Sequence, residues 1–163
     1  VINPGISCRR CGWCLKGEHP LCVKFGLLGE HRPVSFADYV VVPATNVLKV
    51  AHHVPDGVAA AFTLATLTAW RMCVSRANVR AGEEVLIWGI GGGVAQAALR
   101  ICKQIGARVW VTSSDPAKLE QARAMGADEC LNHATEDIGR VIRERTNKRG
   151  VDVVVESVGE KTW

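Results

Sequence analysis

The chain has 163 residues, of which 48% are hydrophobic and 22% are charged, as in ordinary soluble globular proteins. This length suits one domain, or one domain with part of another. The net charge of +4 is scattered, whereas a nucleic-acid surface is denser in basic residues and interleaved with aromatics. No continuous apolar run approaches the roughly 18 residues that span a bilayer. We therefore expect neither a nucleic-acid nor a membrane partner.

Four cysteines lie close together near the start of the chain: Cys8, Cys11, Cys14 and Cys22. The two-residue gaps let neighbouring thiolates turn back onto one ion, so the spacing predicts a closed structural zinc site. Two disulfides are the alternative, and they would suit a secreted domain, but no signal-peptide pattern precedes them. The other three cysteines, Cys73, Cys102 and Cys130, stand in apolar surroundings like core thiols. We expect a cytoplasmic protein.

The segment after the cysteines has weaker patterns. Residues 36–42 are rich in β-forming side chains and stop at Pro43, so they predict a strand, and residues 47–50 predict a second short one. Residues 58–76 are rich in Ala and Thr and predict a helix in two pieces.

Strands and helices alternate from residue 84 onward. The predicted strands are residues 85–88, 109–111, 130–131 and 151–155. The first helix ends at Gly106; the second is capped by Asp115 and ends at Gly126; the third is capped by Thr135 and ends at Gly150. This order predicts an α/β fold with a doubly wound parallel (Rossmann) sheet.

A glycine-rich loop at 89–93 lies between the first strand and helix of that alternation. Glycines there let a dinucleotide pyrophosphate approach the backbone and the helix N-terminus. The Gly-x-Gly-x-x-Gly/Ala pattern fits two registers, one ending on Val94 and one on Ala95, and the smaller Ala95 favours the second. A glycine-rich turn without a ligand is the alternative. The expected contacts are Gly91, Gly92, Gly93 and Val94.

The residues at the end of the second strand are expected to determine the preference between NAD and NADP. An Asp or Glu there binds the ribose hydroxyls of NAD, but this chain has Ser113 and Ser114. Asp115 follows, although its expected task is to cap the helix. Lys118, or Arg108 from another direction, could pair with a 2′-phosphate, so we expect NADP(H) rather than NAD(H). A solvated Lys118 is an equal alternative.

Together these segments resemble the medium-chain dehydrogenase/reductase superfamily, which contains zinc alcohol dehydrogenases and quinone oxidoreductases. The motifs that carry the resemblance are Cys8-x-x-Cys11-x-x-Cys14-x7-Cys22, Phe36-Ala-Asp-Tyr-Val, Leu67-Thr-Ala-Trp, Gly-Gly-Gly-Val-Ala at 91–95, Lys118-Leu119 and Met125-Gly-Ala-Asp128.

The resemblance implies a two-domain oxidoreductase that moves hydride between nicotinamide and a small alcohol, aldehyde, enone or quinone. Residues 1–55 would be the later part of a GroES-like β domain with its zinc lobe, and residues 56–163 an incomplete Rossmann domain. It also implies that Thr68 contacts the nicotinamide, and that a helix Thr bonded to its own backbone is the alternative. Full members are longer and usually homo-oligomeric, so we expect this chain to be a fragment that is inactive alone.

Leu64 stands where zinc alcohol dehydrogenases carry a third catalytic zinc ligand, and leucine cannot bind zinc. Thr63, Thr66 and Cys73 are the nearest alternatives. The resemblance therefore implies hydride transfer without a catalytic zinc, and it assigns no catalytic residue. Two alternatives stay open: a zinc-dependent alcohol dehydrogenase with ligands outside this chain, and a non-enzymatic nucleotide-binding protein.

Overall fold

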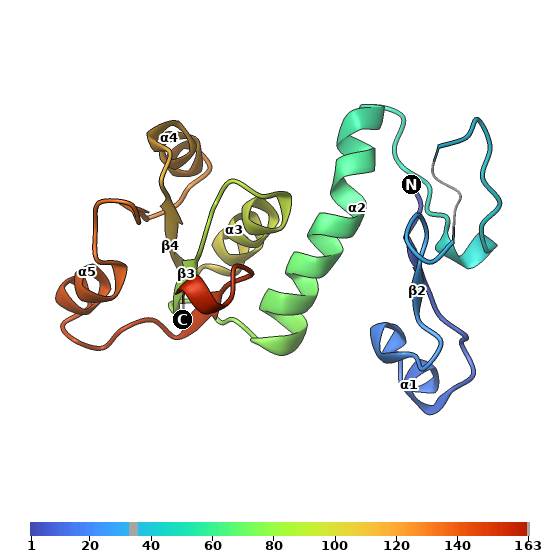
Figure 1. The fold of residues 1–163 in the computed structure, drawn as a ribbon, viewed down its shortest axis with the longest axis horizontal. Coiled ribbons are helices and arrows are strands. Elements are labelled where there is room, and N and C mark those ends of the chain that lie inside the picture. Colours follow the sequence, from blue (N-terminus) through green and yellow to red (C-terminus); the bar gives the residue numbers. More distant parts are fainter. Residues whose placement is uncertain (33–35, 163) are drawn as a thin grey trace. The chain divides into compact units, whose positions relative to one another are not determined.

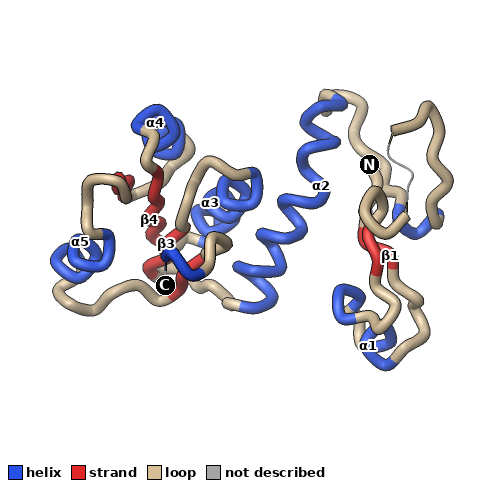
Figure 2. Tube along the Cα trace, viewed as in Figure 1, coloured by secondary structure: helices blue, strands red, loops and turns tan. Residues whose placement is uncertain are grey.

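The fold is described from a computed structural model, which covers residues 1–32 and 36–162 (Figures 1 and 2). The chain divides into two compact units, Val1–Leu64 and Ala65–Trp163, and the division falls inside helix α2 (Asp56–Trp70). Residues 33–35 and Trp163, which belong to the two predicted domains, lie outside the described residues.

The second unit is built on a parallel four-stranded sheet. Its strands are β3 (Glu84–Ile87), β4 (Arg108–Ser113), β5 (Glu129–Asn132) and β6 (Val153–Val155). Their spatial order is β5-β4-β3-β6, and every neighbouring pair is parallel. The chain adds β4 and β5 on one side of β3, and then returns to add β6 on the other side of β3. The direction in which strands are added therefore reverses at β3. The predicted Rossmann-type α/β fold is confirmed.

Helices cover both faces of this sheet: α3 (Gly93–Ile105), α4 (Pro116–Ala124), α5 (Ile138–Arg145) and the π-helix η3 (Arg71–Arg76). Side chains of α3, α4 and η3 share one apolar cluster with alternate strand residues such as Val85 and Val109. Leu86 and Trp110 form a second cluster with Ile138 and Ile142 of α5. Helix α5 lies on the opposite side of the sheet from α3 (Figure 1). Alternate side chains of each strand therefore pack into two separate cores, as expected of a sheet that is buried on both faces.

Local signals placed the ends of two helices correctly. Gly106 ends α3 in the left-handed conformation at φ 92°, and the side chain of Asp115 accepts a hydrogen bond from the backbone N–H of Ala117 at the start of α4.

The predicted ends of the third helix were wrong. Asp137, not Thr135, is its N-cap and accepts the backbone N–H of Arg140 at 3.0 Å. Thr135 instead lies in a turn in which its N–H donates to the carbonyl of Asn132. The helix stops at Arg145 rather than near Gly150, because Asn147 takes a positive φ of 51°.

The helical segment predicted over 58–76 is present, as α2 followed directly by η3. Contrary to our expectation, the joined helix Asp56–Arg76 has 21 residues and a mean hydropathy of 1.4, which is long and apolar enough to span a membrane. Scattered Thr residues interrupt its apolar run without making it polar. Its later part supplies the fully buried Ala69 and Cys73 to the sheet core, although only 11% of its most apolar stretch is buried.

The first unit has little regular structure. It contains α1 (Gly12–Leu15), the antiparallel pair β1 (Gly5–Ile6) and β2 (Gly26–Leu27), and the 3₁₀ helices His19–Leu21 and Ala44–Asn46; a third 3₁₀ helix, Glu160–Thr162, ends the second unit.

Both strands predicted in the first unit were wrong. Residues 36–42 form no strand, and residues 47–50 supply only an isolated bridge between Val47 and Ile2. A strand needs a neighbour for its backbone groups, and the described residues pair none with 36–42. Phe36 and Tyr39 are correspondingly exposed.

Candidate functional site

The four clustered cysteines converge on one point in the first unit. Their sulfur atoms all lie within 4.8 Å of one another, with Sγ–Sγ separations of 4.0 Å for Cys8–Cys14 and 3.5 Å for Cys11–Cys14. Tetrahedral zinc with Zn–S bonds of about 2.3 Å separates its sulfur ligands by about 3.8 Å. The donor set therefore fits a zinc ion as it stands. All four are free thiols, so the disulfide alternative is not what the structure describes.

Backbone N–H groups surround these sulfurs. The N–H groups of Cys8 and Lys24 donate to Cys22 Sγ at 3.2 and 3.3 Å. The N–H groups of Cys14 and Val23 lower the pKa of Cys11 to about 6. Such donors favour the thiolate, which is the form that binds metal.

Cys14 is the exception in this cluster. Burial, followed by hydrogen bonds with the thiols of Cys11 and Cys22, raises the pKa of Cys14 to about 11. A buried thiol that holds its proton this tightly has to release it to a metal, so ion binding at this site would liberate protons.

The glycine loop lies at the carboxyl end of β3 and is tied to the neighbouring strand. Gly89 takes a left-handed φ of 75°, and its N–H donates to Thr112 Oγ1 at 3.0 Å. The N–H of Ile90 donates to the carbonyl of Thr112 at 2.9 Å. On the other side, the N–H of Trp88 donates to the carbonyl of Val155. The loop is thus fixed at the point where the strand order reverses, the usual ligand position in open α/β sheets.

The three glycines after Ile90 have different surroundings. A Cβ on Gly91 would meet Lys118, and a Cβ on Gly93 would lie 3.4 Å from the Cβ of Ala65. Gly92, the N-cap of α3, has an ordinary φ of −89° and nothing within 4 Å of an added Cβ. Neither strain nor packing among the described residues explains glycine at this position. A ligand that approaches the backbone closely would explain it.

Lys118 lies against this loop from α4. Its Nζ is 3.3 Å from the Cβ position of Gly91 and 3.9 Å from Asp115 Oδ2. Ser113 at the end of β4 is buried, and its hydroxyl accepts the N–H of Asp115 at 3.0 Å. Ser114 follows it as an exposed residue. The structure thus brings Lys118 to the loop with the Asp115 carboxylate beside it, while Ser113 and Ser114 directly follow Thr112, which is hydrogen-bonded to the loop.

Arg108, the other cation considered for a 2′-phosphate, lies at the opposite end of β4. It pairs there with Glu129 at 2.8 Å and with Glu84 at 3.4 Å. The suggestion that Arg108 could reach a ligand at Ser113 was therefore wrong, because the length of the strand separates them.

Two further predicted positions lie on helical segments. Thr68 is exposed and directly precedes the buried Ala69 of the sheet core. Cys73 is fully buried in the apolar cluster of the sheet core, which removes it as a metal ligand facing a substrate.

An aromatic pair at the same edge of the sheet was missed from the sequence. The rings of Trp88 and His133, which follow β3 and β5, are stacked at 5.7 Å between centroids and 7° between planes. His133 Nδ1 is buried and has no hydrogen-bond partner among the described residues. From the sequence, Trp88 was interpreted only as a core residue. The pair could have been expected because Trp88 and His133 each follow a strand of the same parallel sheet.

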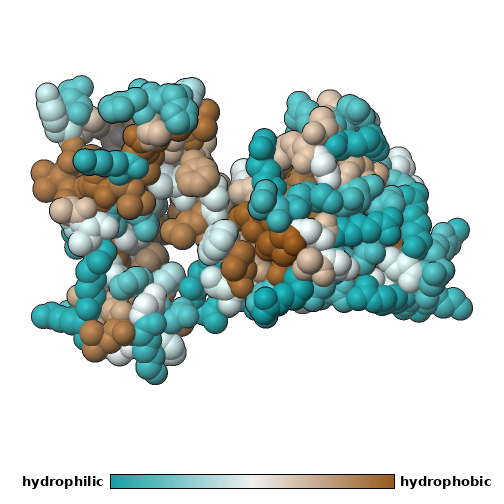
Figure 3. Space-filling view, turned by 180° about the vertical axis from the view of Figure 1, so that it is seen from behind, coloured by the Kyte–Doolittle hydropathy of each residue, from teal (hydrophilic) through white to brown (hydrophobic). Residues whose placement is uncertain are grey.

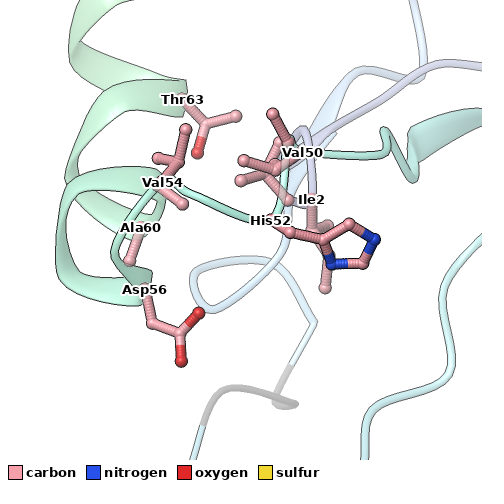
Figure 4. A pocket seen from close by; sticks show the side chains of 10 residues that line it. Ile2, Val50, His52, Val54, Asp56, Ala60 and Thr63 are labelled. Atoms are coloured by element: carbon pink, nitrogen blue, oxygen red, sulfur yellow. The ribbon is translucent and has the colours of Figure 1, made fainter.

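A cavity of about 660 Å³ lies in the first unit, between the start of α2 and the ends of two extended segments. Figure 4 shows Ala60 and Thr63 on the helix facing Val50, while His52 and Asp56 extend in different directions. Its polar groups do not converge, so it is a weaker site candidate than the glycine loop.

The comparisons with known proteins agree with this geometry. Residues 93–163 match the family model described as "Zinc-binding dehydrogenase". The chain is 39% identical over 159 residues to L-threonine 3-dehydrogenase of Anaeromyxobacter sp. (strain K), covering 94% of this chain and 44% of the relative. The chain therefore spans less than half the length of the curated relatives it matches.

Two solved structures illustrate the range of similar folds. A structure described as an NAD-dependent alcohol dehydrogenase is 44% identical with a TM-score of 0.93, covering 98% of this chain and 46% of the other. A quinone oxidoreductase of Pseudomonas syringae pv. Tomato DC3000 is 33% identical with a TM-score of 0.69, covering 75% and 38%.

A parallel sheet with a glycine loop at the carboxyl end of its first strand defines a Rossmann-type α/β protein. With the matches above, the chain belongs to the medium-chain dehydrogenase/reductase superfamily.

Proposed function

We propose that this chain is the dinucleotide-binding and zinc-lobe part of an NAD(P)(H)-dependent oxidoreductase acting on small alcohols, aldehydes, enones or quinones. One observation carries the proposal. Gly92 caps a 13-residue helix at the carboxyl end of β3, with open space where a side chain would stand. The backbone N–H groups and dipole of such a helix favour a pyrophosphate.

When bound, a nicotinamide dinucleotide supplies or accepts the hydride. In our proposal Gly91, Gly92, Gly93 and Val94 hold its pyrophosphate. Lys118 supplies positive charge beside that loop, and Ser113 and Ser114 face the adenosine ribose. Thr68 would contact the nicotinamide.

We propose NADP(H) as the preferred cofactor. No carboxylate stands at position 113, and the ammonium of Lys118 lies next to the loop. The Asp115 carboxylate, 3.9 Å from Lys118, would repel a 2′-phosphate and so limits the preference for NADP(H). One of the similar structures is itself described as NAD-dependent.

We propose that hydride transfer proceeds without a catalytic zinc, because Leu64 offers no ligand atom. The substrate carbonyl would then be polarised by hydrogen bonds alone. A zinc-dependent alcohol dehydrogenase is the second candidate, favoured by the matches to L-threonine 3-dehydrogenase and alcohol dehydrogenase structures. The four-cysteine zinc, homo-oligomeric assembly and a cytoplasmic location complete the proposal.

A turnover assay separates these candidates. Protein that carries this chain together with the segments its relatives have beyond it is incubated with NADPH or NADH and an enone, a quinone or an aldehyde. We expect consumption of NADPH that persists after treatment with a chelator that leaves the four-cysteine zinc in place. Activity lost on chelation and restored by zinc would favour the second candidate. Cofactor binding without turnover on any substrate would make the protein a non-enzymatic nucleotide binder.

A further inference from the structure

Two thiols of the four-cysteine cluster lie close enough to bond to one another. Cys11 and Cys14 belong to one Cys-x-x-Cys step, and their Sγ atoms are 3.5 Å apart. Cys14 Sγ is also 4.0 Å from Cys8 Sγ, so its contact with Cys11 is the shorter of these two. A disulfide bond is about 2.05 Å long, and closing this pair therefore needs the two sulfurs to approach by only about 1.5 Å.

The backbone between the two cysteines already has a shape that suits a disulfide. Cys11 is the N-cap of α1, and Cys14 lies within this helix. The N–H of Leu15 donates to the carbonyl of Cys11 at 3.0 Å, so the turn that joins the pair is closed. Helical geometry places Cα atoms three residues apart at about 5 Å, inside the range of roughly 4.4–6.8 Å that disulfides span. The bond therefore needs no rearrangement of the lobe beyond this turn.

Solvent reaches one member of the pair more easily than the other. Cys11 is half-buried, and the next two residues, Gly12 and Trp13, are exposed. Cys14 is only 6% exposed. A small oxidant therefore meets Cys11 first, and Cys14 lies behind it as the thiol that completes the bond.

We propose that this lobe is a peroxide-sensitive zinc switch, in which hydrogen peroxide joins Cys11 to Cys14 and so removes two of the four ligands of the proposed zinc site. The proposal rests on that zinc site and on no other part of the proposed function. Structural zinc sites use four protein ligands, so Cys8 and Cys22 alone would not retain the ion.

The chemistry balances with one peroxide for each pair. The Cys11 thiolate sulfur attacks one peroxide oxygen, the O–O bond breaks, and a sulfenic acid forms while the departing hydroxide takes a proton from solvent to become water. The Cys14 thiolate sulfur then attacks the Cys11 sulfur, the S–O bond breaks, and the second hydroxide takes a second proton. Two thiolates give up two electrons in total, and one peroxide with two protons becomes two waters.

The regular structure of residues 1–32 is too short to hold the lobe after such a loss. It consists of the four-residue α1, the 3₁₀ helix His19–Leu21 and the two-residue strands β1 and β2. Elements of this length are not stable by themselves, and the free energy of binding a structural metal is folding free energy. Oxidation should therefore loosen the lobe as well as release its metal.

Zinc release and peptide mapping test the switch together. The zinc-loaded chain is treated with hydrogen peroxide beside a zinc-sensitive dye, then alkylated and digested with trypsin. Cleavage after Arg10 and Lys16 yields one peptide, residues 11–16, that carries both thiols, whereas Cys8 and Cys22 fall in other peptides. We expect the loss of about one zinc per chain. Peptide 11–16 should be unalkylated and two hydrogen masses lighter than its reduced form, and dithiothreitol with added zinc should reverse both changes.

Two variants supply the controls. Cys11→His offers a Cys₃His ligand set without the attacking sulfur, so it should load zinc and release little of it at the same peroxide concentration. Cys130→Ser, which changes a cysteine outside the cluster, should release zinc as the wild type does. The wild-type mapping decides the matter even if Cys11→His fails to load zinc.

Three results would overturn the switch. In the first, zinc stays bound in the wild-type chain under peroxide that oxidises Cys11. In the second, zinc leaves while Cys14 is joined to Cys8, or while peptide 11–16 carries no internal disulfide. In the third, the chain holds no zinc before treatment, which would remove the proposed zinc site together with the switch, whereas the first two results remove the switch alone.

Discussion

Asn46 is the buried polar residue that holds the start of the chain to the turn at 44–46. Its Nδ2 donates to the carbonyls of Asn3 at 2.8 Å and Gly5 at 2.7 Å. Asn46→Ala would leave both carbonyls without this donor, so we expect the first unit to lose about 2 kcal/mol of stability. The measurement is urea unfolding followed by the fluorescence of Trp13, the one tryptophan of residues 1–64.

Thr45→Ala is the matched control, because the Thr45 hydroxyl makes only a 3.5 Å contact with Asn46 Oδ1. That variant should unfold close to the wild-type midpoint. Equal stability of Asn46→Ala and wild type would contradict the role we assign to the two hydrogen bonds.

At the scale of single residues, helix ends were predicted correctly where only one nearby residue suits the position. Gly106 and Asp115 follow directly from helix-end preferences. The cap of the third helix failed because Thr135 and Asp137 are both good capping residues two positions apart. Only the turn of the chain after Asn132 decides between them. The stacking of Trp88 and His133 required two strand ends to be placed side by side, which no local pattern provides.

Asp128, just before β5, is hydrogen-bonded to Lys103 of α3 and to the Val109 N–H of β4, and we expect it to make the stability of the second unit depend on acid. Burial alone would raise the pKa of Asp128, but the hydrogen bonds from Lys103 and from the Val109 N–H outweigh it and hold that pKa below its usual value. A carboxylate with a depressed pKa in the folded state stabilises the protein above its unfolded pKa. That contribution is lost as the pH falls through the folded pKa.

We therefore expect the melting midpoint of the second unit to fall as the pH drops below about 4, the usual pKa of aspartate. Asp152, whose pKa is lowered by Arg149, adds to the same loss. Asp128→Asn should be less stable at neutral pH and should show a shallower decline in acid, measured by calorimetry from neutral to acidic pH. A decline as steep as that of the wild type would contradict this assignment.

The zinc lobe is the other element with a direct test. Dialysed protein should hold about one zinc per chain, because four thiolates close a single tetrahedral site. Cys22→Ser should lose most of the metal, while Cys130→Ser, outside the cluster, should retain it; metal analysis measures both. Full zinc content in Cys22→Ser would remove the four-cysteine site.

Elements were predictable where the chain itself supplies their partners. The four parallel strands satisfy one another, and their apolar runs were sufficient to find them. The segment 36–42 has equally good β-forming side chains, yet it forms no strand because no described residue pairs with its backbone.

Apolar patches remain on the surface of the molecule (Figure 3), and α2 contributes exposed Phe62, Leu67 and Trp70 to the apolar surface.

At the scale of the whole molecule, the chain contains a four-cysteine lobe and a parallel-sheet unit with a glycine loop at the carboxyl end of β3. The alternation of strands and helices and the order of the motifs were enough to reach the superfamily from the sequence. Ser113, Ser114 and Lys118 led us to predict NADP(H) from the sequence, and this preference stays a prediction. The folded chain adds that Lys118 lies against the loop and 3.9 Å from Asp115, an arrangement that the sequence alone does not provide.

Calorimetric titration of the zinc-loaded chain with NADPH and with NADH is the most direct test of the dinucleotide site. We expect binding of NADPH, weaker binding of NADH, and at least a tenfold loss of affinity, about 1.4 kcal/mol, in Gly92→Val. Gly57→Val, at another glycine whose Cβ position is open, should bind like the wild type. Absence of binding by the folded wild-type chain, or equal affinity in Gly92→Val, would contradict the site.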